Sequence, residues 1–189
     1  VPADAGAVLA FRLGTIADGA LVARKICDVE RVICASPDYV ARHGQPVDPA
    51  SLHAHRCLVL SDAPELARWP FLADGKRTVV DVRGRGRVTA NNAETLLELA
   101  LLGEGIVRLP DVIVGPSLRA GRLVPLFEGT HVAEPVPVHA IYPWSRLRPP
   151  KVGAMVDFLG EKFSDVPWRT PPPRERAPRP RVRPRIAPR

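Results

Sequence analysis

The sequence predicts an α/β fold, and two observations carry this prediction. First, patterns typical of buried strands alternate along the chain with patterns typical of helices. Residues 88–111 are the clearest case, because an apolar run ending at Ala90 precedes a leucine-rich helix and then a short apolar strand that stops at Pro110. Second, a chain of 189 residues is long enough to bury a core in one or two domains, and its hydrophobic content of 46% is ordinary for such a protein. Helices that alternate with strands favour a mostly parallel sheet.

The first elements are predicted to be extended. Residues 6–15 have the apolar pattern of a buried strand that ends in a glycine turn. Residues 21–37 supply two further extended runs, in which β-branched residues are concentrated at Val29, Val32 and Ile33.

Two short helices with capping signals come next. Ser36 is the predicted N-cap of the first helix, with Pro37 at its first position and Gly44 at its end. The second helix is capped near Asp48 and leads into a strand at residues 57–60.

The middle of the chain is predicted to hold a hairpin and a buried helix. Residues 68–90 have the pattern of two strands around a turn at Asp74-Gly75, followed by a glycine-broken extension. The helix that follows Asn92 is apolar nearly all round, so we expect it to be buried on several sides. Residues 106–110 form the next strand.

Two helices and two strands are predicted in the remaining ordered chain. A helix begins at Asp111, is closed by Gly121 and precedes a strand. Residues 136–143 alternate as a strand, and residues 149–163 form an amphipathic helix. Its apolar stripe consists of Val152, Met155, Val156, Leu159 and Phe163.

The net charge of +7 comes from the C-terminal tail, because residues 169–189 contain eight arginines and one glutamate. Residues 164–189 are a Pro/Arg-rich segment that cannot bury apolar area, so we predict a disordered tail that is in part polyproline-like. Such a tail is either a solvated extension or a sequence-independent contact to nucleic-acid phosphates. We favour the extension, because no aromatic residue is interleaved with the arginines for base stacking.

Cysteine usage predicts a reducing compartment. Cys27, Cys34 and Cys57 show no C-x-x-C spacing and stand among apolar residues, as expected of small buried hydrophobes. The sequence shows no membrane-spanning run and no signal peptide, so we expect a cytoplasmic protein. The chain starts at Val1 within a strand pattern, and we expect that its beginning is missing.

The motifs of common enzymes are incomplete in this sequence. Gly84 and Gly86 lack the third glycine of a dinucleotide fingerprint, and no G-x-S-x-G nucleophile elbow occurs. Glu94 and Glu98 are one helical turn apart, as on a solvated helix edge. We therefore predict no catalytic residue, no enzyme activity and no cofactor.

One run of residues resembles a metal site. His53-x-His55-x-Cys57 would place three ligand side chains on one face of a strand. A fourth ligand at a matching spacing is missing, so we predict no bound metal.

Two adjacent asparagines stand where the leucine-rich helix begins. Capping of the helix N-terminus accounts for one of Asn91 and Asn92. A helix N-terminus beyond the carboxyl end of a parallel strand also offers unpaired N–H groups to a ligand. The pattern alone leaves both interpretations open.

Eight segments occur in one order with short spacers: residues 8–15, 21–26, 31–60, 69–71, 88–111, 118–127, 137–143 and 151–159. This order resembles the effector-binding domain of LysR-type transcriptional regulators over about residues 7–163. The most specific parts are CASPDYVARHG at 34–44 and AGRLVPLF at 120–127 followed by PVHAIYP.

The resemblance implies a type-2 periplasmic-binding-protein-like fold, in which two α/β subdomains joined by two crossover strands close on an effector. Residues 1–36 then form a remnant of subdomain I, residues 37–135 form subdomain II, residues 136–163 return to subdomain I, and residues 164–189 form the tail. Subdomain I is incomplete in this chain, because the family's first strand, first helix and second strand are absent. The family's N-terminal helix-turn-helix is absent as well.

The resemblance also implies a binding site. Ala90, Asn91 and Asn92 match the strand-to-helix turn that lines the effector cleft, and Gly14 and Thr15 would face them from the other subdomain. The expected effector is a small organic acid or polar metabolite, which would shift the population of cleft states. DNA binding is expected only through the absent helix-turn-helix. We expect a homo-oligomer for the full-length protein and no membrane partner.

Two alternatives of other classes remain open. One is a free-standing small-molecule-binding protein of the same fold, against which the missing signal peptide and the incomplete first subdomain count. The other is an inactive truncated product whose basic tail binds nucleic acid non-specifically. Strong salt dependence that is lost on cutting after Ser164 would identify the second.

Overall fold

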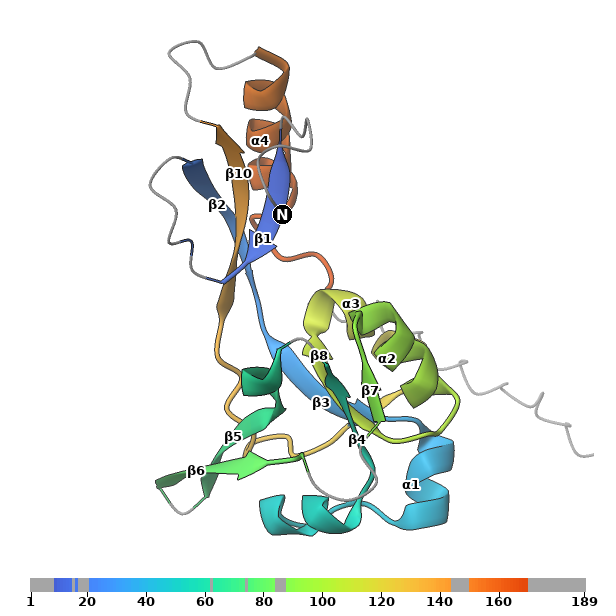
Figure 1. The fold of residues 1–189 in the computed structure, drawn as a ribbon. Coiled ribbons are helices and arrows are strands. Elements are labelled where there is room, and N and C mark those ends of the chain that lie inside the picture. Colours follow the sequence, from blue (N-terminus) through green and yellow to red (C-terminus); the bar gives the residue numbers. More distant parts are fainter. Residues whose placement is uncertain are drawn as a thin grey trace, which may run out of the picture.

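The computed structural model describes residues 9–14, 16, 21–61, 63–73, 75–83, 88–143 and 150–169. It confirms the α/β class and shows two parts joined by extended chain (Figure 1). The first part is a three-stranded sheet of order β1-β10-β2 with one helix, α4. The second part is a five-stranded sheet of order β7-β4-β8-β3-β9, together with the two-stranded sheet β5-β6 and the remaining helices.

The strands are β1 (Ala10–Leu13), β2 (Leu21–Val29), β3 (Arg31–Ala35), β4 (Cys57–Leu60), β5 (Arg68–Ala73), β6 (Lys76–Asp81), β7 (Val88–Ala90), β8 (Ile106–Pro110), β9 (Val124–Pro125) and β10 (Val136–Pro143). The helices are α1 (Pro37–His43), the 3-10 helices η2 (Pro49–Ala54) and η3 (Pro64–Ala67), α2 (Ala93–Leu101), α3 (Asp111–Arg119) and α4 (Pro150–Lys162). Their positions agree closely with the patterns in the sequence.

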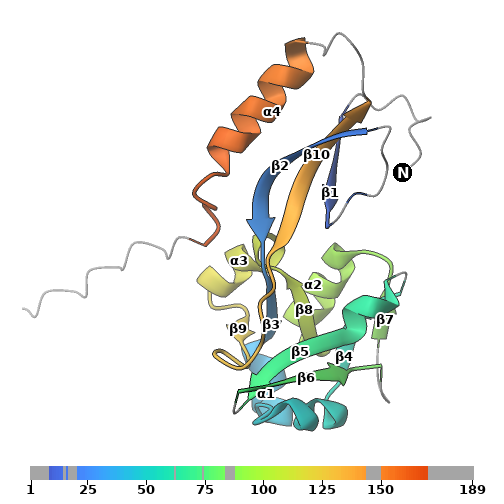
Figure 2. The same ribbon diagram turned by 90° about the vertical axis from the view of Figure 1, so that its left-hand side faces the viewer.

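The chain passes between the two parts at Glu30, where β2 of the three-stranded sheet continues as β3 of the five-stranded sheet (Figure 2). The chain returns through residues 132–135 and enters β10, which pairs antiparallel with β2 from Val136 to Pro143.

The prediction of a mostly parallel sheet is wrong. Among the described strands, only β4–β7 and β4–β8 pair in parallel, and all other pairs are antiparallel. The reason lies in the connection at Glu30. There β2 of the first sheet continues directly as β3 of the second sheet, and in this direction β3 runs antiparallel to β8. The hairpin β5–β6 adds a further antiparallel pair.

The two predicted caps are confirmed. Ser36 has an extended backbone, and its Oγ accepts a hydrogen bond of 3.2 Å from the N–H of Tyr39 at the start of α1. Asp48 and Ser51 form a reciprocal capping box at the start of η2, with 2.7 Å from the Ser51 N–H to Asp48 Oδ1. Gly44 ends α1 with a positive φ of 78° that favours glycine.

The five-stranded sheet carries a hydrophobic core on each face. On one face, Ile33 and Ile106 pack with Trp69 and Phe71 of β5. On the other face, α2 and α3 cover the sheet. The expectation that α2 is buried on several sides holds only in part: Leu96 and Ala100 are buried, Leu97, Leu99 and Leu101 are half-buried against the same core, and the C-cap Leu102 is 71% exposed.

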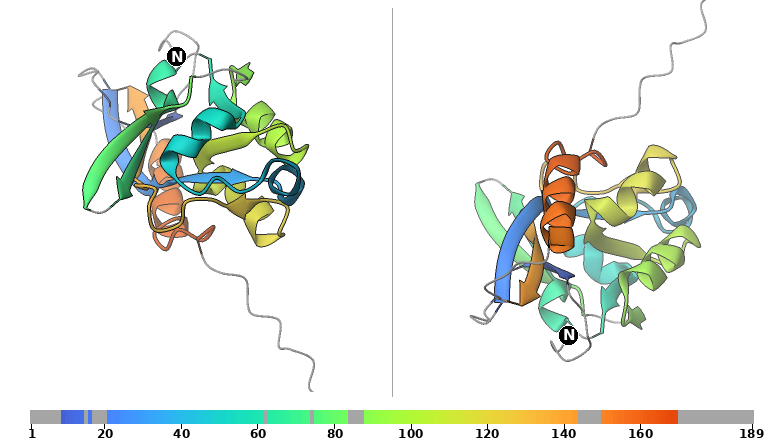
Figure 3. Two further views of the ribbon diagram at one scale, coloured as in Figure 1. Left: turned by 90° about the horizontal axis from the view of Figure 1, so that it is seen from below. Right: turned by 90° about the horizontal axis from the view of Figure 1, so that it is seen from above.

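The three-stranded sheet is covered by α4, which lies along β2 when the molecule is viewed from above (Figure 3). Val152 and Val156 of the predicted stripe are buried, whereas Met155 is 48% exposed. The expectation that β1 is a buried strand is also wrong, because Phe11 and Leu13 are about half exposed, at 49% and 52%. The helix covers β2 and β10, and its buried side chains do not extend over β1.

The described chain continues beyond Ser164, where the predicted tail begins. Trp168 packs against Phe163 with 5.6 Å between ring centroids. Arg169 forms ion pairs with Glu30 and Asp111. Residues 170–189 of the predicted disordered tail lie outside the described residues.

Candidate functional site

One edge of the five-stranded sheet collects the carboxyl ends of its parallel strands. Pro110, at the end of β8, pairs with Arg31, where the chain enters from the three-stranded sheet. Because β4 runs parallel to both β8 and β7, the carboxyl ends of all three strands lie at the same edge. Helices α2 and α3 begin here, so their N-termini face the three-stranded sheet (Figure 1). We call this the carboxyl edge.

A recess of about 140 Å³ opens at the carboxyl edge. Its lining residues are Val59, Leu60, Ser61, Pro64, Ala67, Arg83 and Thr89. Arg83 lies at the rim with its charge already compensated, because Nε donates to both carboxylate oxygens of Asp81 at 2.9 and 3.0 Å. These hydrogen bonds lower the pKa of Asp81 to about 2. Ser61 is held by a hydrogen bond of 2.8 Å from its N–H to the carbonyl oxygen of Ala90.

The structure places Ala90, Asn91 and Asn92 together at the carboxyl edge. Asn92 is the N-cap of α2, and its Oδ1 accepts a hydrogen bond of 2.8 Å from the N–H of Thr95. Its Nδ2 donates to Asn91 Oδ1 at 3.0 Å. Capping therefore accounts for Asn92, whereas the amide N–H₂ of the exposed Asn91 has no protein partner among the described residues.

Gly14 lies on the other part of the molecule, at the end of β1. Its φ of 93° requires glycine, its N–H donates to the carbonyl oxygen of Pro137 at 2.8 Å, and its own carbonyl oxygen is 3.0 Å from Nδ1 of His139. Within the described residues, no hydrogen bond joins Gly14 to Asn91 or Asn92. Thr15, the other residue expected on this side, lies outside the described residues.

A contact between an arginine and a histidine beside the carboxyl edge was not foreseen from the sequence. Arg108 is half-buried in β8, and its Nε donates to Nε2 of His131 at 2.9 Å. Burial, with the charge of Arg108 as a second cause, lowers the pKa of His131 to about 4, so this imidazole is neutral at pH 7 and can accept the hydrogen bond. An arginine inside the apolar run IVRLP was the signal in the sequence.

The run His53-x-His55-x-Cys57 serves structural contacts. Nδ1 of His55 is 3.2 Å from the hydroxyl of Tyr39, and Cys57 is buried, which raises the pKa of its thiol to about 12. The described residues contain no group of three or more His, Cys, Asp or Glu that could hold a metal ion. The same residues contain no helix that is both long and apolar enough to cross a membrane.

A comparison of this chain with known protein families identifies the family to which it belongs. The family described as LysR substrate binding domain matches residues 6–164. The chain belongs to this family.

Relatives of this LysR domain are transcriptional regulators. The HTH-type transcriptional regulator PtxR of Pseudomonas aeruginosa is 32% identical over 161 residues, which cover 85% of this chain and 51% of the relative. The regulatory domain of CrgA, a LysR-type transcriptional regulator from Neisseria meningitidis, superposes with a TM-score of 0.75 at 30% identity, covering 82% of this chain and 74% of that domain. The effector domain of AmpR from Pseudomonas aeruginosa shares the fold, with a TM-score of 0.69 at 20% identity. The chain thus spans about half the length of the curated relatives it matches.

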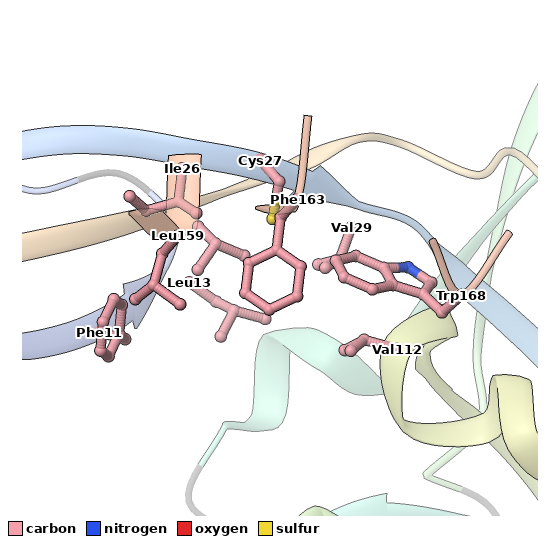
Figure 4. A pocket seen from close by; sticks show the side chains of 10 residues that line it. Phe11, Leu13, Ile26, Cys27, Val29, Val112, Leu159, Phe163 and Trp168 are labelled. Atoms are coloured by element: carbon pink, nitrogen blue, oxygen red, sulfur yellow. The ribbon is translucent and has the colours of Figure 1, made fainter. Parts of the chain in front are cut away.

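A second cavity of the LysR domain lies at the junction of its two parts and is apolar (Figure 4). Its volume is about 290 Å³, and its lining includes Leu13, Val29, Val112, Phe163 and Trp168. It offers no hydrogen-bonding side chain to a polar ligand, apart from the Cys27 thiol and the Trp168 indole at its wall. The carboxyl edge is therefore the better candidate for a polar effector.

Substituting the two asparagines is expected to separate capping from ligand contact. Asn92→Ala should lower the free energy of unfolding by about 1 kcal/mol, because the N–H of Thr95 loses its acceptor. Asn91→Ala should change it by less than about 0.5 kcal/mol, because this side chain is exposed and caps nothing. Chemical denaturation of both variants measures the difference, and equal losses would contradict the assignment of Asn92 as the cap.

His131 is expected to make the LysR domain less stable in mild acid. Its folded-state pKa of about 4 is below the unfolded value of 6.5, so its contribution is complete above pH 6.5 and is lost as the pH falls toward 4. We expect a loss on the order of 1–2 kcal/mol after allowing for solvent screening at this half-buried site. Carboxyl groups titrate over part of the same range, so the measurement is the difference between the wild type and His131→Gln. Parallel stability curves for the two proteins would contradict the prediction.

Proposed function

We propose that this domain is the effector-sensing part of a LysR-type transcriptional regulator, which binds a small organic acid or polar metabolite at the carboxyl edge. The observation that carries the proposal is the combined match of sequence and fold to the CrgA regulatory domain. The relatives are HTH-type regulators of transcription, which supports a sensing role and a site of action in the cytoplasm.

The geometry of the carboxyl edge supports this choice of ligand. The α2 N-terminus presents backbone N–H groups that have no preceding turn of helix to accept their hydrogen bonds, and their partial positive charge favours a carboxylate or another polar acceptor. Asn91 adds an amide that has no protein acceptor among the described residues. Ala90 and Asn92 would complete this side of the site, and Gly14 and Thr15 would approach from the three-stranded sheet.

This chain spans about half the length of the curated relatives it matches. The proposal therefore extends to a longer protein that contains this domain. Residues 1–36 and 136–163 would belong to one effector subdomain and residues 37–135 to the other. A ligand that prefers one arrangement of the two subdomains would shift their population and thereby change DNA binding by an attached helix-turn-helix in a homo-oligomer. A ligand with equal affinity for both arrangements would have no effect.

The test is a titration followed by amide NMR, with a panel of small mono- and dicarboxylic acids, amino acids and sugars. We expect saturable shifts of the amides of Gly14, Ser61 and Ala90–Ala93 with at least one class of compound. Asn91→Asp should weaken binding of the acids by charge repulsion, whereas Val47→Ala, at a site that is 88% exposed, should leave it unchanged. Saturable binding that maps only to the apolar cavity, or to no residue of the carboxyl edge, would overturn the proposal.

A further inference from the structure

Two arginines lie on one face of the five-stranded sheet, next to the carboxyl edge. Ile33 of β3 is the register partner of Arg108 in β8, and Arg31 is two residues before Ile33. Side chains two residues apart on a strand point to the same face, so Arg31 and Arg108 are diagonal neighbours on the face that carries Ile33. Both side chains are half-buried.

Neither guanidinium group is neutralised by direct contact with an acid. Within the described residues, Arg31 makes no hydrogen bond or ion pair, and Arg108 donates only to the neutral imidazole of His131. Glu134 acts on both guanidinium groups at longer range, but its carboxylate contacts Arg77. Glu65 acts at longer range on Arg31.

Half-burial destabilises the charged form of both guanidinium groups, and a bound anion would offset this destabilisation. Burial, with the charge of Arg31 as a second cause, lowers the pKa of Arg108 to about 10, so the group is destabilised but still charged at pH 7. Two half-buried guanidinium groups on neighbouring strands are stabilised when one carboxylate binds both, because such charge-assisted hydrogen bonds are strong.

The pair is also within the reach of a ligand at the carboxyl edge. Cys57 of β4 pairs in parallel with Ile106 of β8, so Val59 and Arg108, each two residues further along, lie beside one another on the same face. Val59 lines the recess at this edge. Arg31 is opposite Pro110, the last residue of β8.

From this geometry we infer that Arg31 and Arg108 bind the carboxylate of the effector, and that the effector is therefore an organic anion. The inference rests on the proposed function, since it uses the same edge of the sheet. His131 is a positioning residue, because it holds Nε of Arg108, while no described residue binds the terminal guanidinium nitrogens that would contact the anion.

The experiment compares acetate with its neutral isostere acetamide, using amide and arginine Nε–H resonances of the full chain. Acetate is expected to shift the Nε–H signals of Arg31 and Arg108 saturably, and acetamide is not. Arg31→Met and Arg108→Met should each weaken acetate binding by roughly tenfold. Arg56→Met is the matched control, because Arg56 precedes β4 at the end opposite the carboxyl edge and is already paired with Glu104. It should leave the affinity for acetate unchanged.

The outcomes separate the inference from the proposed function. Equal shifts of the Ser61 and Asn92 amides by acetate and acetamide, or unchanged acetate affinity in both methionine variants, would overturn the role of the arginines and leave binding at the carboxyl edge intact. No shift at that edge with either probe would count against both. Arg31→Met keeps the test decisive if Arg108→Met fails to fold, since Arg31 has no protein hydrogen bond to lose in the described structure.

Discussion

Replacing Trp69 with alanine is expected to lower the free energy of unfolding by about 3–5 kcal/mol, a large part of the stability of a typical domain. Trp69 is 1% exposed and lies in the core between β5 and the five-stranded sheet. Its removal deletes the largest side chain of that core and leaves a cavity that the surrounding strands can close only in part. Chemical denaturation followed by circular dichroism measures the change without relying on tryptophan fluorescence.

The loss should extend to the candidate site, because the hairpin that carries Trp69 also frames the recess. Ala67 and Arg83 flank the hairpin and line the recess. Leu72→Ala is the control in the same strand, since Leu72 is 48% exposed, and it should cost less than about 1 kcal/mol. Similar losses for Trp69→Ala and Leu72→Ala would show that the hairpin is not anchored by this core.

Local signals in the sequence were sufficient for element boundaries and caps. Ser36 and Asp48 were predicted as caps because the hydrogen bonds that define a cap join residues two or three positions apart. Strand direction was not predicted correctly, because the pairing of β3 with β8 joins Arg31 to Pro110 across a long stretch of chain. Pairing of this kind depends on tertiary packing, which periodicity does not record.

The candidate site was predictable only in part for the same reason. Asn91 and Asn92 follow one another in the sequence, so their shared place at the start of α2 could be foreseen. The contact between Arg108 and His131 requires residue 131 to lie against β5, where it forms a bridge with Phe71. The local sequence pattern around either residue does not predict this contact.

The prediction of a disordered tail from composition is wrong for residues 164–169. Averaging over 164–189 hides Trp168, an aromatic residue that differs from the Pro/Arg repeat that follows. Arg119 donates a hydrogen bond of 2.6 Å to the carbonyl oxygen of Trp168, so this segment contacts α3 of the second part, although it follows α4 of the first.

Arg169→Met is expected to lower the free energy of unfolding by about 2 kcal/mol, because it leaves the buried carboxylate of Asp111 without its cationic partner. The Asp111 side chain is only 10% exposed, its Oδ1 accepts from the N–H of Val112, and its Oδ2 is bound by Nε of Arg169. Arg169 also pairs with Glu30, the residue at which the chain passes from one sheet to the other. The loss should therefore affect the junction of the two parts as well as the start of α3.

Two further variants make the prediction specific. Asp111→Asn in the Arg169→Met background should recover part of the loss, since it removes the unpaired charge and keeps an acceptor for the N–H of Val112. Arg77→Met is the control for an exposed pair, because Arg77 and Glu134 are about half exposed, and it should cost less than about 1 kcal/mol. If Arg169→Met costs no more than Arg77→Met, Arg169 contributes no more than an ordinary surface ion pair. A larger loss that Asp111→Asn partly reverses would establish that the segment after α4 joins the two parts beside the N-terminus of α3.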